Sequence, residues 1–427
     1  MTIGIIGAGF TGLAAGYRLA KRGHKVFIFE KEKNPGGLAL GFKEKNWNWT
    51  LEQYYHHWFT NDNLILNLAK EVNQEVITIR PKTSSLVNGK VFQFDSPFTL
   101  IKFPLLSFIN RIRMGFSLAI FRYNPFWSIF ENYNAVQILE KLMGRKGFRL
   151  IWLPLFKNKF GKHFNEISAS WFWARVRKRT SRLAYPKEGF LNFAQKIITA
   201  IKNNKGIVLL ETEVIKIKQE EKIQLIVKNN SGKENLYSFD RLIITTPSFL
   251  FLKIAPQLPK RYKNEILKKQ SLGAINVILR LKNKFLKDNT YWLNVCDEKS
   301  PIMAIVEHTN FIDKVNYNNE HLLYIGNYTE KESKLFKMSN QQLLNIYDPY
   351  LRKLNENYKQ NVISSYIFKT PFAQPIIPNK SFILPFETPL SNVFLANMEQ
   401  VYPWDRGTNY AVELGEEVAK IIENEKN

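Results

Sequence analysis

The alternation of apolar and polar positions predicts a strand, a helix and a second strand at the N-terminal end of the chain. Ile3 to Ile6 is a short apolar run, which is typical of a buried parallel strand. Apolar residues then recur at helical spacing from Leu13 to Ala20, and the pattern stops at Gly23. A second strand is expected at 25–29, directly before Glu30. The pattern therefore predicts a β-α-β unit.

Further apolar runs predict a β-meander and a closing strand and helix. Three strands and one turn are expected, at 213–217, 223–228 and 241–247, with the turn at 230–232. Because these strands follow one another closely, we expect the meander to return the chain to the first sheet. A last buried strand is expected at 395–398, and a helix opens at Gly407 and continues to Ile422.

Glycines at the first turn indicate a site for a dinucleotide. Gly7 allows a tight turn, Gly9 lets the backbone approach a pyrophosphate, and Gly12 lets the helix pack closely on the strand. The N–H groups at the start of this helix would then face the phosphates. Glu30 stands where a carboxylate accepts hydrogen bonds from a ribose. A second glycine pair, at 36–37, offers another close backbone approach to the cofactor.

Together these motifs resemble the flavin-binding superfamily that includes amine oxidases, protoporphyrinogen oxidase, phytoene desaturases and UDP-galactopyranose mutase. The segment from Tyr185 to Phe190 is similar to the Pro-x-Gly-Gly segment of that superfamily, although Glu188 occupies the place of the first glycine. The resemblance implies a flavin nucleotide, FAD, and a set of residues that bind it. The residues implied are Gly7, Gly9, Phe10, Thr11, Gly12, Glu30, Lys31, Gly36, Gly37, Leu38, Val214, Thr246, Met398, Gly407, Thr408 and Asn409.

The fold class expected is α/β, with a glutathione-reductase-like FAD-binding Rossmann domain interleaved with a mixed α+β substrate domain. The composition, 45% hydrophobic and 14% aromatic, is that of a globular protein. We expect the cofactor domain at 1–75, 187–255 and 362–427, and the substrate domain at 76–186 and 256–361. Cys296 is the one cysteine and lies outside the flavin motifs, which predicts noncovalent FAD and a reducing, cytoplasmic compartment.

The chain carries a net charge of +24, with 61 Lys and Arg against 37 Asp and Glu. The excess of positive charge is dense between residues 141 and 187, but no nucleic-acid-binding motif accompanies it. A phosphorylated substrate or a membrane surface therefore explains the charge better than nucleic acid does. The segment 98–130 is rich in Phe, Leu and Ile but is too interrupted by arginine to span a bilayer. The sequence leaves two alternatives open, a helix in an anionic membrane interface and a cover for the substrate cavity.

Candidate catalytic side chains are sparse, as expected where a flavin carries the electron chemistry. His56 and His57 stand together among aromatic residues, and their segment is similar to the histidine-containing segment of the mutase. Adjacent histidines on a strand point to opposite faces and no third ligand follows at a fitting spacing, so we expect no metal. Glu307 ends an apolar run and is a further catalytic candidate, although it would equally suit a strand end with a turn cap.

Three arginines are candidates for binding an anionic substrate: Arg175, Arg179 and Arg406. The first two follow a tryptophan with a spacing similar to that of the mutase, whose arginines clamp a substrate diphosphate. The stretch 271–279 carries no lysine where the amine oxidases have one near flavin N5. We therefore expect an FAD-dependent oxidoreductase that takes a hydride from an apolar or anionic small molecule, phosphorylated or lipid-linked substrates included. The alternatives are a mutase-like enzyme without net oxidation and a noncatalytic FAD-binding scaffold at a membrane.

Overall fold

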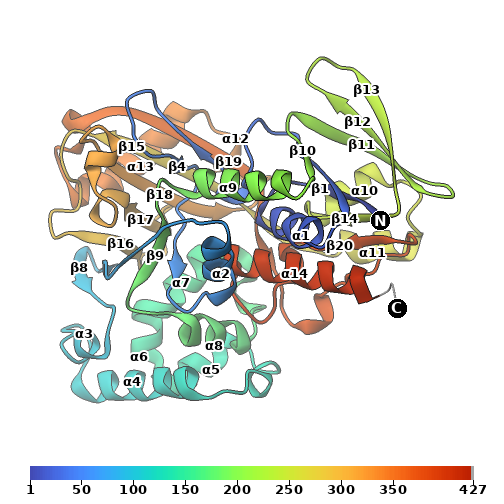
Figure 1. Ribbon diagram of the computed structural model, residues 1–427. Coiled ribbons are helices and arrows are strands. Elements are labelled where there is room, and N and C mark those ends of the chain that lie inside the picture. The colour runs from blue at the N-terminus through green and yellow to red at the C-terminus, as the bar shows by residue number, and fades with distance from the viewer. Residues whose placement is uncertain (425–427) are drawn as a thin grey trace.

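A five-stranded parallel sheet lies at the centre of the cofactor-binding part of the structure, a computed structural model that describes residues 1–424 (Figure 1). Its strands, in spatial order, are β10 (Ile207–Leu209), β2 (Lys25–Phe29), β1 (Thr2–Ile6), β14 (Arg241–Ile244) and β20 (Val393–Leu395). The central strand β1 pairs on both sides, so that Ile5 faces Ile28 of β2 and Ile243 of β14. All three side chains are fully buried, which explains the unbroken apolar run.

Four helices pack around this sheet: α1 (Phe10–Lys21), α2 (Asn63–Glu71), α9 (Phe190–Asn203) and α14 (Thr408–Asn424). The first helix packs against both α9 and α14, which brings the two ends of the sequence together (Figure 1). The approach of α14 is close, because a Cβ on Gly415 would lie 2.4 Å from the carbonyl oxygen of Thr11. The predicted β-α-β unit and closing helix are therefore confirmed, the helix from Thr408 onward.

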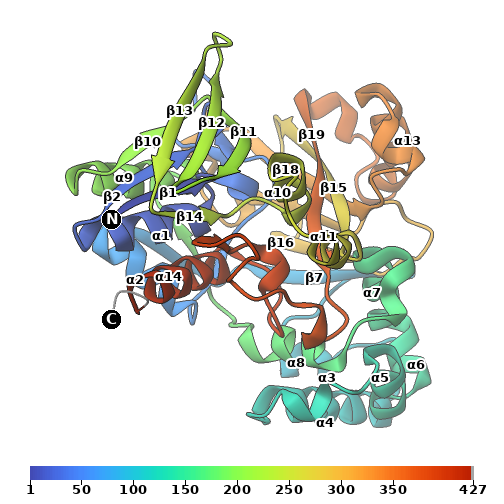
Figure 2. The ribbon, with the colours of Figure 1, turned by 90° about the vertical axis from the view of Figure 1, so that its right-hand side faces the viewer.

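Two strands of the predicted β-meander are present as β11 (Thr212–Gln219) and β12 (Ile223–Asn229), but its third strand is β13 (Glu234–Phe239), which was not predicted. The strand predicted at 241–247 is β14, which belongs to the parallel sheet. Both ribbon views show β11, β12 and β13 projecting from the sheet before the chain returns to it through β14 (Figure 2). The inner face, which includes Leu225, Val227 and Phe239, is buried against the sheet and against α10 (Ser248–Ile254) and α11 (Lys260–Leu267). The alternation of buried and exposed positions along β13 follows from this one-sided packing.

A mixed seven-stranded sheet forms the second layer, as the resemblance implied. Its order is β19 (Val362–Ile376), β15 (Gln270–Leu281), β18 (His321–Thr329), β17 (Ala304–Glu307), β16 (Thr290–Val295), β7 (Lys82–Val87) and β8 (Lys90–Gln93). Successive residues of β15 serve opposite faces. Ile278 joins the core shared with the cofactor-binding part, whereas Val277 and Leu279 join the core beneath α13 (Asn340–Leu354). Both faces are therefore buried.

The boundary expected at residue 362 does not coincide with the sheets. Residues 362–376 form β19 and pair along β15, so they extend the seven-stranded sheet. We propose that the last cofactor-binding segment begins after Ile376. The short strands that join the layers are β3 (Gly41–Phe42), β4 (Leu51–Glu52), β5 (Trp58–Phe59), β6 (Val76–Ile79) and β9 (Leu183–Pro186). A short helix, α12 (Lys334–Lys337), precedes α13.

A helical region between β8 and β9 has its own core and lies along one edge of the molecule in both ribbon views. It comprises α3 (Pro97–Ile101), α4 (Phe108–Tyr123), α5 (Ala135–Met143), α6 (Arg145–Gly147), α7 (Leu153–Phe160) and α8 (Ala169–Lys178). Within residues 1–424, no helix combines the length and the apolar character that crossing a membrane would require.

Candidate functional site

The turn between β1 and α1 has the geometry of a phosphate cradle. Gly7 adopts a φ of +106°, a conformation that favours glycine. A Cβ on Gly12 would lie 2.0 Å from the carbonyl oxygen of Gly7, so only glycine permits this packing of helix on turn. Gly9 is the N-cap residue of α1 and, being a glycine, offers no side chain to the free N–H groups of the first turn. The first backbone N–H groups of α1, from Phe10 to Gly12, have no partner within the helix and remain available to an anion.

The second glycine pair lies directly beside this turn. Gly9 and Gly36 form a parallel β-bridge, and a Cβ on Gly37 would approach the Cα of Gly9 to 3.1 Å. A side chain at position 37 would therefore crowd the first turn. The neighbouring Lys31 is exposed and pairs with Glu32 at 3.5 Å.

Glu30 lies at the end of β2, at the rim of the cradle. Its Oε2 accepts a hydrogen bond of 2.8 Å from the backbone N–H of Ala8, and its Oε1 accepts one of 3.0 Å from that of Glu32. Burial raises the pKa of this carboxyl above its usual value. Thr246, which follows β14, has a buried hydroxyl with no hydrogen-bond partner within the described residues. The cradle, the carboxylate and the unpartnered hydroxyl fit a dinucleotide such as FAD.

The other predicted cofactor residues surround the same end of the sheet. Val214 is buried in β11, next to a β-bulge. Met398 lines a small pocket together with Asp405 and Arg406. At the start of α14, the hydroxyl of Thr408 accepts a hydrogen bond of 2.8 Å from the indole N–H of Trp58, which fixes this helix end beside the histidine segment.

Asn409 fixes the same helix end to α2. Its side-chain oxygen accepts a hydrogen bond of 3.2 Å from the backbone N–H of Ile65. With Gly407 just before it, α14 begins between two segments of the cofactor-binding part. The positive end of its dipole is therefore held in place to stabilise a negative charge.

Both histidines are half-buried among aromatic rings. The Nδ1 of His56 lies 2.6 Å from the carbonyl oxygen of Tyr54, and the Nδ1 of His57 lies 3.1 Å from the hydroxyl of Tyr291. Burial lowers the pKa of His56 to about 4 and that of His57 to about 3. Since a carbonyl oxygen only accepts, Nδ1 of His56 carries the proton and its Nε2 is an acceptor.

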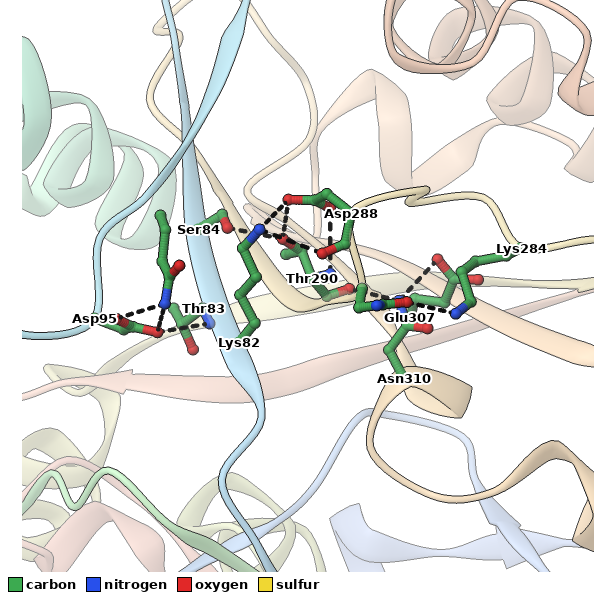
Figure 3. A network of polar contacts seen from close by, with 11 residues as sticks. Lys82, Thr83, Ser84, Asp95, Lys284, Asp288, Thr290, Glu307 and Asn310 are labelled. Atoms are coloured by element: carbon green, nitrogen blue, oxygen red, sulfur yellow. Dashed lines mark hydrogen bonds and ion pairs between the residues drawn. The ribbon is translucent and has the colours of Figure 1, made fainter. Parts of the chain in front are cut away.

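Glu307 is placed differently. It is fully buried, and its two carboxylate oxygens accept hydrogen bonds of 2.9 Å and 2.6 Å from the backbone N–H groups of Phe285 and Leu286. Asn310 links it to the backbone of Thr290 within a polar network at the end of the seven-stranded sheet (Figure 3). Burial raises the pKa of this carboxyl to about 7. These contacts favour a structural role for Glu307, which holds the turn after β15.

The predicted arginines lie around one carboxylate that sequence reasoning missed, Asp405. Its Oδ2 lies 3.0 Å from Nη1 of Arg175 and 2.9 Å from Nζ of Lys159, a second residue whose role was not foreseen. The neighbouring Arg406 donates from Nε to the side-chain oxygen of Gln374 at 2.9 Å and contacts the hydroxyl of Tyr328. We call Lys159, Arg175, Arg179 and Arg406 the cationic cluster; it holds four basic side chains against one acidic group.

Local sequence explains how α8 and the residue directly after it supply two members of the cationic cluster. Trp171 and Arg175 are four residues apart and so share one side of the helix, and Arg179 follows four residues later as the C-cap of α8. The guanidinium of Arg175 and the ammonium of Lys159 both lie over the ring of Trp171, at 5.5 Å and 5.1 Å from its centroid. The indole ring therefore stabilises both positive charges.

Arg179 is the member of the cationic cluster without a partner. Among the described residues, none makes a hydrogen bond or an ion pair with its guanidinium, whereas Arg175 is held by Asp405. The side chain is exposed to solvent. It therefore stays charged at neutral pH and presents a free guanidinium fork.

The histidine segment faces the cationic cluster. The charge of Arg406 contributes to the lowered pKa of His56, and the charges of Arg179 and Arg175 contribute to that of His57. The fold thus brings together the predicted histidines and all three predicted arginines, beside the start of α14. Over residues 1–424, no cluster of three His, Cys, Asp or Glu side chains is arranged to hold a metal ion.

Comparisons with known proteins show the family to which the chain belongs. Residues 10–422 match the profile of the family described as flavin containing amine oxidoreductase. The amine oxidase [flavin-containing] B of Mus musculus is 24% identical over 457 aligned residues, which cover 98% of this chain and 85% of that protein. The coproporphyrinogen III oxidase of Staphylococcus aureus is 24% identical over 306 aligned residues, which cover 60% of this chain and 63% of that protein.

Solved structures show the same fold. A triple mutant of putrescine oxidase has a TM-score of 0.77 at 15% identity, with 100% of both chains covered. A putative protoporphyrinogen oxidase from Exiguobacterium sp. 255-15 has a TM-score of 0.76 at 14% identity, with 99% of both chains covered. The resemblance found in the sequence is confirmed, and the chain belongs to the flavin-containing amine oxidoreductase family, whose members are FAD-dependent oxidoreductases.

Proposed function

We propose that this enzyme oxidises an organic substrate that carries an anionic group, with transfer of a hydride from a substrate carbon to flavin N5. The observation that carries the proposal is the cationic cluster beside the start of α14, with its free Arg179 guanidinium. Guanidinium groups form paired hydrogen bonds with carboxylate and phosphate oxygens, so either group, free or lipid-linked, suits the cluster.

The chain's own residues would orient the substrate rather than carry the electrons. Bound FAD supplies the acceptor for the hydride at the flavin ring. The cationic cluster fixes the anionic end of the substrate. The neutral His56 offers Nε2 to an N–H or O–H of the substrate and accepts a hydrogen bond from the group that must lose a proton.

We also propose that FAD is held without a covalent bond to cysteine. Cys296 is buried just after β16, in the core of the helical region, and burial raises the pKa of its thiol to about 12. A protonated, buried thiol is a poor nucleophile and lies in a different core from the cofactor cradle.

A diphosphate also fits the cationic cluster, which supports flavin-dependent rearrangement of a diphosphate-linked sugar as a second candidate. The two functions differ in their redox balance. Oxidation consumes an electron acceptor in each turnover, whereas rearrangement yields a product isomeric with the substrate and needs the flavin reduced beforehand.

The pH dependence of substrate affinity tests the proposed function. Burial lowers the pKa of Lys159 to about 7, although Asp405 favours the charged form. Lys159 is therefore protonated below this value and neutral above it. We expect the dissociation constant of an anionic substrate, measured by anaerobic flavin reduction, to rise about tenfold as the pH increases from about 6 to about 8.

Two variants make this test specific. Lys159→Arg keeps its charge over the whole range and should flatten the profile at the tight-binding level. Lys159→Gln carries no charge and should flatten the profile at the weak-binding level. A wild-type affinity for the anion that stays constant across this pH range would count against the proposal.

A further inference from the structure

We propose that the outer face of the helical region, formed by residues 98–133, docks onto the surface of an anionic lipid bilayer. The face is defined by large apolar side chains that remain in contact with water. Among the described residues, ten of the eighteen exposed large hydrophobic side chains fall within this single segment. Scattered exposed apolar residues are ordinary, but such a concentration marks an interaction surface.

The helix α4 supplies the centre of this face. Ile109, Ile112 and Phe116 follow one another at helical spacing and are 77%, 51% and 70% exposed. The opposite side of the helix carries Met114 and Phe121, which are fully buried in the core of the helical region. Because the inner side already fixes the helix, the outer apolar side is not needed for packing. If this segment only covered the substrate cavity, as one interpretation of the sequence held, the exposed apolar residues on its outer side would have no role.

The basic side chains on this face indicate that its binding partner is anionic. Between residues 98 and 133 four basic side chains, Lys102, Arg111, Arg113 and Arg122, stand against one acidic side chain, Glu131, and the first three lie among the exposed apolar groups. Arg111 and Arg113 donate hydrogen bonds to backbone carbonyls and so keep their full positive charge. More basic residues follow at 141–149, on and just after α5 and α6, which both pack against α4. Among these basic residues only Arg149 makes a close ion pair with Glu140, at 2.9 Å.

An anionic bilayer complements both properties of the face. Apolar side chains enter the interface while lysine and arginine remain at the level of the head groups. A second copy of the same face would bring like charges together, which disfavours a symmetric dimer. Both ribbon views place α4 at the edge of the molecule away from the β-meander, so docking leaves the cofactor sheet clear of the bilayer (Figures 1 and 2).

Vesicle flotation of the full-length, FAD-loaded protein tests this proposal. We expect it to float with vesicles of phosphatidylcholine mixed with phosphatidylglycerol, and far less with vesicles of phosphatidylcholine alone. The double variant Ile109→Gln and Phe116→Gln should weaken binding at least about tenfold, since glutamine keeps the helix but removes the apolar contact. The double variant Arg145→Gln and Lys146→Gln should weaken binding roughly fivefold for each charge.

A matched variant controls for general effects of losing surface hydrophobicity. Leu236 and Leu267 are 58% and 70% exposed but lie on β13 and at the end of α11, far along the chain from this face. Leu236→Gln with Leu267→Gln should bind vesicles like the wild type, and the flavin spectrum should confirm that every variant is folded. Equal flotation with neutral and anionic vesicles would overturn the proposal. So would wild-type binding by the Ile109 and Phe116 variant, or light scattering that shows a dimer which that variant dissolves.

Discussion

Gly12→Ala is expected to yield a folded protein that is purified without its flavin. The added Cβ would lie 2.0 Å from the carbonyl oxygen of Gly7 and 3.1 Å from the hydroxyl of Thr245, so the turn must move away from the helix. That movement displaces the N–H groups that face the pyrophosphate. We expect the dissociation constant of FAD to rise by roughly fivefold to 150-fold, because crowding of this kind costs roughly 1–3 kcal/mol.

The measurement is the flavin absorbance per mole of purified protein, followed by titration of the apoprotein with FAD. Gly115→Ala provides the control. It makes the same change within a helix, but its Cβ would meet only Leu100, at an ordinary distance of 3.6 Å. A Gly12→Ala protein that retained one FAD per chain would show that the cradle at β1 and α1 is not the pyrophosphate site.

Asp405→Asn is expected to destabilise the protein strongly in the absence of anions. The substitution removes the one acidic group of the cationic cluster and leaves Lys159 and Arg175 without their ion pair. Breaking a buried pair typically costs about 3–5 kcal/mol, and the partial exposure of Asp405, 21% of its side chain, reduces this to roughly 2–4 kcal/mol. The free energy of unfolding, measured with urea, should fall by that amount.

Added anion should reverse part of this loss. Inorganic pyrophosphate can replace the missing carboxylate among the cations, so we expect it to stabilise Asp405→Asn more than the wild type. Glu75→Gln is the matched control, since Glu75 is 71% exposed and pairs with Lys187 at the surface, so its loss should leave the free energy of unfolding nearly unchanged. Equal effects of the two substitutions would mean that the cationic cluster does not depend on Asp405.

The local motifs could be predicted because their physics lies within a few consecutive residues. The glycines of the first turn, the strand at 25–29 and the helix after Gly407 all follow from short-range periodicity and backbone geometry. At Glu188 the backbone keeps the conformation that glycine favours, because this residue adopts a φ of 68° at the position where the superfamily has glycine. Its side chain therefore tolerates a conformation that glycine adopts at lower cost.

Long-range pairing could not be predicted from the sequence. Lys159 and Asp405 are separated by 246 positions, and neither is unusual in its own segment. An isolated acidic residue next to Arg406 in a strongly basic chain was the one available signal for Asp405. The assignment of 362–376 to a sheet likewise depends on its pairing with β15, which no local pattern encodes. For Glu307 the sequence offered two interpretations, a catalytic group and a cap at a strand end. Both of its oxygens accept hydrogen bonds from the backbone of Phe285 and Leu286, which favours the cap.

The cationic cluster as the binding site for an anionic substrate is the central claim, and the anaerobic half-reaction of the flavin tests it most directly. The enzyme is mixed with amines and alcohols that carry a carboxylate or a phosphate, each compared with its uncharged ester, and flavin absorbance is followed. Arg179→Gln is compared with Arg182→Gln, which alters an exposed arginine just beyond α8. We predict that an acid reduces the wild-type flavin with a dissociation constant at least about tenfold below that of its ester. Arg179→Gln should diminish this difference without lowering the limiting rate, and Arg182→Gln should preserve it. Equal dissociation constants for acid and ester in the wild type, or an undiminished difference in Arg179→Gln, would contradict the account.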